Sequence, residues 1–186
     1  MRVYFLPIFI VFTATLGLAS CNGLHTPSGA NRASLTALLI DAQDMPQGWI
    51  TEGAAPTALE MERSPVSSGI AFFPEASPAY GKVEQDVYGF NTEQDAHRDF
   101  SYAVKEYSGS TDPQGWGFRA QHAKESHISC RIYPNITYPV CHWIARYDSV
   151  VVQLTAWIIP GYMTIPGMQR IAEEIDAKAE RVLSNP

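Results

Sequence analysis

The stretch from Cys130 to Cys141, CRIYPNITYPVC, decides how the last third of this chain folds. Pro134 to Thr137 has the composition of a hairpin loop, so the residues on either side are expected to pair as antiparallel strands. With Tyr133 placed opposite Tyr138, Cys130 lies directly opposite Cys141. Opposed side chains of a non-hydrogen-bonded antiparallel pair lie close enough for a disulfide. The turn and a bridge between these two cysteines therefore predict each other.

A second tight turn, at Asp148 and Ser149, extends the hairpin to a three-strand antiparallel meander. It places Tyr147 opposite Val150 and, further along, Cys141 opposite Ala156. In this register one face of the sheet is apolar and is expected to face the core; it carries Ile128, Cys130, Ile132, Cys141, Trp143, Ala145, Val152, Leu154, Ala156 and Ile158. A slip of one residue would exchange the two faces, so the alternating pattern opposes it.

The other face of the meander mixes charged, polar, aromatic and apolar side chains. We take its polar and aromatic members as candidate ligand-binding residues: Arg131, Tyr133, His142, Arg146, Gln153 and Trp157. Charge-assisted hydrogen bonds around an aromatic floor are suited to a small anionic or amphipathic ligand. The alternative is that a helix covers the apolar half of this face and solvent takes the rest.

Periodic patterns upstream and downstream predict the remaining elements. Helical spacing predicts helices over 34–43, from Asn91-Thr92 to Tyr107, and from Thr164 to Leu183, while short apolar or alternating runs predict strands over 70–73 and 82–90. This order predicts an α+β fold. We expect an antiparallel sheet that includes the C-terminal three-strand meander and is covered mainly on one face by helices.

The N-terminus has the features of a bacterial lipoprotein precursor. Arg2 precedes an apolar run to Leu18, and Leu18-Ala19-Ser20-Cys21 resembles the lipobox, in which the cysteine receives a diacylglyceryl group before cleavage. We expect a signal peptide over 1–20, a lipid-anchored flexible tether over 21–33 and a single α+β domain over 34–186. The alternatives are a plain signal peptide with a chance cysteine, or an uncleaved membrane helix, for which the run is short and broken by Pro7.

Lipid on Cys21 would hold the mature protein on a cell membrane or outer membrane, facing the exterior or the periplasm. In such an oxidising compartment Cys130 and Cys141 form an even pair, which again favours a disulfide. Acidic residues outnumber basic ones 19 to 13, and the mature part contains no run of Lys or Arg. Nucleic-acid binding is therefore not expected, because it depends on clustered positive charge.

The sequence contains no familiar catalytic or metal-binding motif. G-x-S-x-G, H-E-x-x-H, C-x-x-C and a phosphate-binding glycine loop are all absent. His122, His127 and His142 lie near one another in the meander region, but their spacing does not converge on a metal. We expect no enzymatic activity, no metal and no cofactor, and keep a hydrolase as the third hypothesis.

One further motif, Asp44-Met45-Pro46-Gln47-Gly48-Trp49, is similar to the D-x-P-x-G-W stretch that follows the first helix in many surface lipoproteins of actinobacteria and related Gram-positive lineages. Together with the strands, the helices and the disulfide hairpin, it makes the domain resemble the extracellular sensor domain of mycobacterial serine/threonine kinases and related free-standing lipoproteins. The resemblance implies binding or sensing of a small or amphipathic ligand, not catalysis. The rival hypothesis is a structural or protein-interaction lipoprotein of the envelope.

Overall fold

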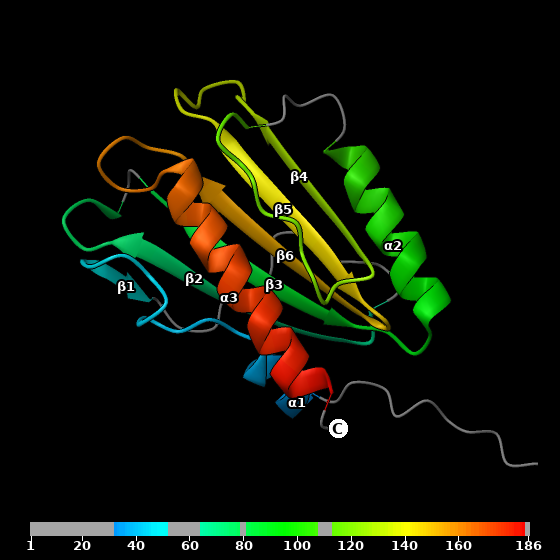
Figure 1. Ribbon diagram of the computed structural model, residues 1–186. Helices are drawn as coiled ribbons and strands as arrows, with labels where there is room; N and C mark the ends of the chain where they lie inside the picture. The colour runs from blue at the N-terminus through cyan, green and yellow to red at the C-terminus, as the bar shows by residue number, and fades with distance from the viewer. Residues whose placement is uncertain (1–31, 52–63, 79–80, 108–112, 185–186) are drawn as a thin grey trace, which may run out of the picture.

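The computed structural model describes residues 32–51, 64–78, 81–107 and 113–184. One antiparallel sheet runs in the order β1-β2-β3-β6-β5-β4, and Figure 1 shows its arrangement. Its strands are β1 (Trp49–Thr51), β2 (Val66–Pro74), β3 (Val83–Gly89), β4 (Glu125–Arg131), β5 (Val140–Tyr147) and β6 (Val150–Trp157). The helices are α1 (Arg32–Ala37), α2 (Glu93–Glu106) and α3 (Ile165–Leu183). The predicted α+β class with an antiparallel sheet is confirmed.

The sheet separates two apolar cores. The larger lies on the face that α1 and α3 cover, where Trp143 and Leu154 of the sheet pack with Met168 and Ile175 of α3. The smaller lies on the other face, where α2 packs Phe100 among sheet residues that include Ile144. Because α2 contacts β5 and β6, it covers only part of its face of the sheet.

The meander has the predicted register, with Cys130 opposite Cys141, Cys141 opposite Ala156 and Tyr147 opposite Val150. The predicted disulfide joins Cys130 and Cys141. Ile132 corrects the predicted core face, because its side chain is 65% exposed. The β4–β5 ladder ends where Arg131 pairs with Val140, so the chain has left the sheet before Ile132. For the same reason the predicted pairing of Tyr133 with Tyr138 does not form.

The first helix differs from its predicted bounds at both ends. α1 begins at Arg32, inside the predicted tether, and ends at Ala37. Beyond it the buried amide of Gln85 on β3 receives a hydrogen bond from Ile40 N (2.6 Å) and donates one to Leu38 O (3.0 Å). These bonds take backbone groups that a longer helix would use, so a partner distant in sequence ends the helix early.

The other elements lie close to their predicted positions. Thr92 caps α2 through Oγ1, which accepts from Asp95 N (3.1 Å), and Thr164 caps α3 by accepting from Gly167 N (3.1 Å). β2 is longer than the predicted strand over 70–73, because the small residues before Ile70 also pair with β3.

The D-x-P-x-G-W motif forms the turn between α1 and β1. Gly48 has φ +84°, a left-handed conformation that favours glycine, and Trp49 is buried at the start of β1. Asp44 Oδ2 accepts from Asp41 N (2.9 Å) and lies 3.6 Å from Lys178 Nζ of α3. The motif therefore fastens the N-terminal segment to the larger core.

The predicted signal peptide and Cys21 lie outside the described residues. Within the described ranges, no helix has the length and apolar character needed to cross a membrane.

Candidate functional site

Polar residues occupy matching positions across four strands on the sheet face that α2 partly covers. Ser129 of β4 lies opposite His142 of β5, which lies opposite Thr155 of β6. In the adjacent row Gln153 of β6 lies opposite Asp86 of β3. Neighbours on one face of a sheet are close enough for their side chains to interact, so the register gathers these residues into one group.

We call this group, with the aromatic and basic residues that contact it, the polar cluster. Its members are Asp86, Tyr107, Ser129, Arg131, Tyr133, His142, Gln153 and Thr155. Asp86, Ser129 and Gln153 are each at most 3% exposed, and His142 is 6% exposed. Such burial is unusual for polar side chains unless hydrogen bonds compensate for the lost water.

His142 lies at the centre of the polar cluster. Its Nε2 is 3.0 Å from the Tyr133 hydroxyl and its Nδ1 is 3.1 Å from Thr155 Oγ1. The Tyr107 ring stacks on the imidazole, with ring centroids 3.9 Å apart. Burial, helped by the positive charge of Arg131, lowers the pKa of His142 to about 4. The ring is therefore neutral at neutral pH, and one nitrogen donates while the other accepts.

Gln153 connects the centre of the cluster to β3. Its Nε2 donates to the Tyr107 hydroxyl (3.0 Å) and to Thr155 Oγ1 (3.3 Å). Across the sheet, burial and then the charge of Glu84 raise the pKa of Asp86 to about 8. Asp86 is accordingly protonated at neutral pH, while Glu84 forms an ion pair with Lys82 (2.9 Å).

Arg131 lies at the opposite end of the cluster, at the end of β4. Its guanidinium carbon is 4.1 Å from the centre of the Tyr133 ring and 5.9 Å from that of Tyr107. These are cation–π contacts, and they hold the guanidinium against the aromatic rings without using its hydrogen-bond donors.

Four buried side-chain atoms have no hydrogen-bond partner within the described ranges, and all four belong to the polar cluster: Asp86 Oδ1, Ser129 Oγ, Arg131 Nε and Gln153 Oε1. An unpaired buried donor or acceptor costs about 1–3 kcal/mol. The unpaired groups are thus the hydroxyl of Ser129, a carboxyl oxygen of Asp86, the amide oxygen of Gln153, which accepts, and the Nε–H of Arg131, which donates.

The structure gathers four of the six predicted ligand-binding residues into the cluster, namely Arg131, Tyr133, His142 and Gln153. Arg146 lies elsewhere, because its Nε donates to Glu125 Oε2 (2.6 Å) and its Nη1 to Asp148 O (3.0 Å). Trp157 is half-buried at the end of β6, opposite Val140.

The Arg146 contact also includes a histidine from α2. His97 Nδ1 lies 2.9 Å from Glu125 Oε2, the atom that Arg146 contacts. Partial burial raises the pKa of Glu125, but the hydrogen bonds from His97 and Arg146 outweigh it and hold this pKa below its usual value.

Sequence reasoning missed Asp86, Tyr107, Ser129 and Thr155. The alternation over 82–90 places Asp86 on the polar face of its strand, but only the pairing of β3 with β6 brings it to Gln153. The sequence pattern places Tyr107 on the apolar face of its helix. Its hydroxyl accepts a hydrogen bond from Gln153 only because α2 ends over the meander. The three histidines considered as metal ligands are separated: His142 lies in the cluster, His122 pairs with Glu180, and His127 lines a groove at β4.

Comparison with known proteins yields similarity to solved structures. No known protein-family model matches the chain, and no curated protein does. Among solved structures, the chain is similar to the extracellular domain of PknH from Mycobacterium tuberculosis, with a TM-score of 0.50 and 15% identity over 82% of this chain and 98% of that chain. At this identity the likeness concerns the fold, and at that level the resemblance to kinase sensor domains holds.

Proposed function

We propose that this protein is a binding or sensor domain of the cell envelope, and that it captures a small polar or amphipathic ligand at the polar cluster. The observation that carries this proposal is the gathering of four unpaired buried polar atoms on the face that the sequence marks as mixed. Buried polar groups in folded proteins are nearly always paired, so an unpaired group calls for a partner. A ligand that pairs with these atoms recovers free energy that the free protein lacks.

The unpaired atoms define the chemistry of the ligand. Arg131 Nε needs an acceptor, whereas Gln153 Oε1 needs a donor. Ser129, beside Arg131, adds a hydroxyl, and Asp86, opposite Gln153, adds a carboxyl oxygen. A ligand with an anionic or carbonyl oxygen near one end and a hydroxyl or amine near the other satisfies all of them. From β4 to β3 the cluster spans three strand spacings, about 14 Å, which is within the size of a small molecule.

The charge balance of the cluster favours an anionic group on the ligand. At neutral pH the raised pKa of Asp86 and the lowered pKa of His142 leave both side chains uncharged. Arg131 keeps its positive charge, as arginine does in proteins. Its contacts to the rings of Tyr107 and Tyr133 leave the donors free for an anion, and the rings supply flat apolar surface.

Binding accounts for these contacts better than catalysis does. A serine nucleophile needs a base within hydrogen-bond reach, but within the described ranges Ser129 Oγ has no hydrogen-bond partner. Both nitrogens of His142 are engaged by Tyr133 and Thr155. We therefore propose no enzymatic role for the cluster. The lipobox-like segment and the extracellular structural neighbour together support a location outside the cytoplasm, with Cys21 carrying the lipid.

Native mass spectrometry tests this function. The mature protein with Cys21→Ser, exported without lipid, is incubated with an extract of the cells that naturally make it, beside the variants Arg131→Gln and Arg146→Gln. We expect a reproducible bound mass on the parent and on Arg146→Gln, because Arg146 is held by Glu125 outside the cluster. Arg131→Gln is expected to lose it. A bare parent protein, or equal loading of Arg131→Gln, would contradict the proposal.

A further inference from the structure

β4 is the last strand of the sheet, and its outer edge carries backbone groups that β5 does not use. The Cα atoms of Cys130 and Cys141 are 4.0 Å apart, the short separation of a non-hydrogen-bonded pair. Pair types alternate along an antiparallel ladder, so Ile128 and Ser126 also form non-hydrogen-bonded pairs with β5. The N–H and C=O groups of these residues therefore point away from β5, toward the open edge.

Between its charged ends, Glu125 and Arg131, this edge lacks features with which natural sheets often protect an edge strand. Such strands are often shortened or interrupted by proline or a bulge. β4 runs over seven residues, ESHISCR, without proline. Among the described residues no further strand pairs with it. It is consequently able to accept another strand.

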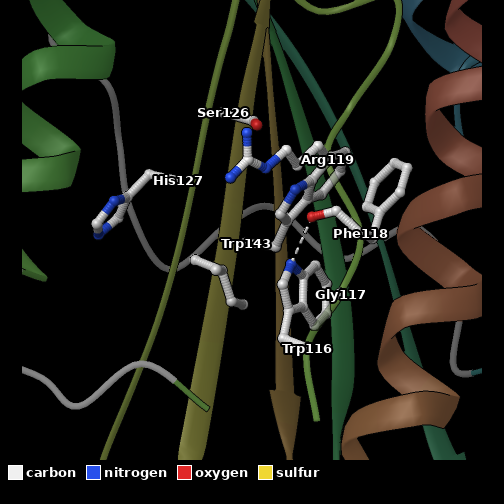
Figure 2. Close-up of a pocket in the computed structure, with 8 residues that line it drawn as sticks. Trp116, Gly117, Phe118, Arg119, Ser126, His127 and Trp143 are labelled. Carbon is white, nitrogen blue, oxygen red and sulfur yellow. Dashed lines mark hydrogen bonds between the residues drawn. The ribbon is translucent and has the colours of Figure 1, made fainter. Parts of the chain in front are cut away.

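A groove with aromatic walls runs beside this edge (Figure 2). It has a volume of about 330 Å³ and is lined by Trp116, Gly117, Phe118, Arg119, Ser126, His127, Ile128 and Trp143. Three of these residues are consecutive in β4, so the groove follows the strand edge and not one sheet face alone. In Figure 2 the rings of Trp116, Phe118 and Trp143 gather on one side of β4, while His127 points away from them.

The outer wall of the groove is fixed in place by α3. Asp176 Oδ2 accepts from the backbone N–H groups of Gln121 (2.8 Å) and His122 (3.3 Å). Gly117 N donates to Gln169 Oε1 (2.9 Å). The ring of Phe118 lies 6.1 Å from that of Trp143. The wall is thus held in position before any partner arrives, which reduces the entropy cost of binding.

We propose that the β4 edge and this groove bind an extended peptide segment of a partner protein, which adds a strand beside β4 and inserts one large apolar side chain between the rings. In this mode main-chain hydrogen bonds supply affinity and side-chain pockets supply specificity. Ser126 and Ile128 supply the outward groups, two residues apart, at the groove itself. None of the described residues that line the groove is acidic, while Arg119 carries a positive charge. An acidic residue in the peptide complements this charge.

A second copy of this chain is the rival occupant of the edge. The only acidic residue of β4, Glu125, already pairs with Arg146 and His97. The β4 strand of a second copy therefore brings no unpaired acidic side chain to Arg119. The site is distinct from the polar cluster, because the rings of the groove lie on the α3 face of the sheet.

The test is an NMR titration of the ¹⁵N-labelled mature protein carrying Cys21→Ser. The probe is the acetylated peptide amide EVWVT, in which the glutamate and the tryptophan share one side of a strand. We expect a Kd of about 1 mM or lower. Chemical shifts should change at the amides of Ser126 and Ile128 and at the indole N–H groups of Trp116 and Trp143. No shift up to that concentration would overturn the proposal, and so would shifts confined to other parts of the sheet.

Backbone pairing is tested separately with two further peptides, N-methylated at alternate residues in opposite phases. In one peptide the methyl groups block the amides that face β4, and binding is expected to weaken on the order of tenfold or more. In the other peptide those amides stay intact, and binding is expected to be retained. Equal binding by both phases would overturn strand addition.

A matched pair of protein variants tests the same edge from the protein side. Ser126→Pro removes an outward N–H that β5 does not use and is expected to reproduce the loss, whereas Ser126→Ala keeps binding. If Ser126→Pro does not fold, the peptide phases still decide. Sedimentation that shows the free protein to be a dimer through β4 would overturn the proposal in favour of a second copy.

Discussion

The ring of Tyr107, the residue that ends α2, lies parallel to the imidazole of His142 on β5, with the ring planes 13° apart. The contact joins the end of a helix to the centre of the sheet, next to the four unpaired buried polar atoms found in the described part of the chain. The Tyr107 hydroxyl accepts from Gln153 in the same place, and burial raises its pKa to about 12, so it stays a neutral phenol. The end of α2 thus covers the polar cluster with Tyr107, whose ring stacks on His142 and whose hydroxyl accepts a hydrogen bond from Gln153.

The first prediction concerns pH and Asp86. Folding raises the pKa of this carboxyl from 3.8 to about 8, so the unfolded chain releases its proton first and the free energy of unfolding falls as pH rises toward 8. Folding lowers the pKa of His142 from 6.5 to about 4. This group therefore makes the free energy of unfolding rise with pH, but mainly below pH 6.5. Between pH 6.5 and 8, Asp86 alone is expected to remove about 2 kcal/mol.

Urea unfolding of the Cys21→Ser protein at pH 6.5 and pH 8 measures this change. Asp86→Asn is expected to abolish the decline, because the amide cannot ionise. Asp148→Asn serves as the control, since that carboxyl is 63% exposed. If the decline persists unchanged in Asp86→Asn, Asp86 is not the group responsible.

The second prediction concerns the disulfide between Cys130 and Cys141. The bridge closes a loop with a sequence separation of 11, and the chain-entropy model gives it at most about 3 kcal/mol. Replacement of both cysteines by alanine is expected to lower the free energy of unfolding by up to that amount while the fold remains. Denaturant unfolding measures it, and peptide mapping without reductant checks the pairing. Free thiols in the exported protein would refute the bridge.

The third prediction concerns Gln85. Its buried amide pairs with Ile40 N and Leu38 O, so Gln85→Leu leaves two backbone groups unpaired and is expected to cost about 2–4 kcal/mol. The Ile40 amide should exchange with solvent faster, as hydrogen-exchange mass spectrometry can show. The comparison is Gln94→Leu, at an exposed position of α2. Equal stability of the two variants would mean that other groups hold the end of α1.

The fourth prediction concerns the anchor. Cys21→Ser is expected to move the protein from the membrane fraction to the soluble fraction of the cells that make it, because the lipid attaches through the thiol. Ser20→Ala keeps a small residue before the cleavage site and should stay with the membrane. Fractionation followed by immunoblotting measures both. Membrane retention of Cys21→Ser would argue for an uncleaved helix.

The meander was predictable because its determinants are local. The turns, the alternation of apolar residues and the two cysteines all lie between Ile128 and Ile158, and they fix one register. The caps of α2 and α3 are likewise local, since Thr92 and Thr164 each bond a backbone N–H three residues on. Ile132 was assigned wrongly because the alternation continues past Arg131, where the ladder itself stops.

The polar cluster was predictable only in part. Arg131, Tyr133, His142 and Gln153 lie on the meander and share a face by alternation. Asp86 joins them through the pairing of β3 with β6, and Tyr107 through the packing of α2, and neither contact leaves a periodic signal in the sequence. Arg146 shares the same face, and the predicted register also places Glu125 opposite it on β4, so this ion pair was predictable from the meander alone.

A high-resolution crystal structure of the protein purified from the cells that naturally make it tests ligand capture most directly. We predict non-water electron density within hydrogen-bond distance of Arg131 Nε and Gln153 Oε1, and the same density should be lost in crystals of Arg131→Gln. Ordered water alone on these atoms, or a direct hydrogen bond between Asp86 and Gln153 that closes the cluster, would contradict a ligand site on this face of the sheet.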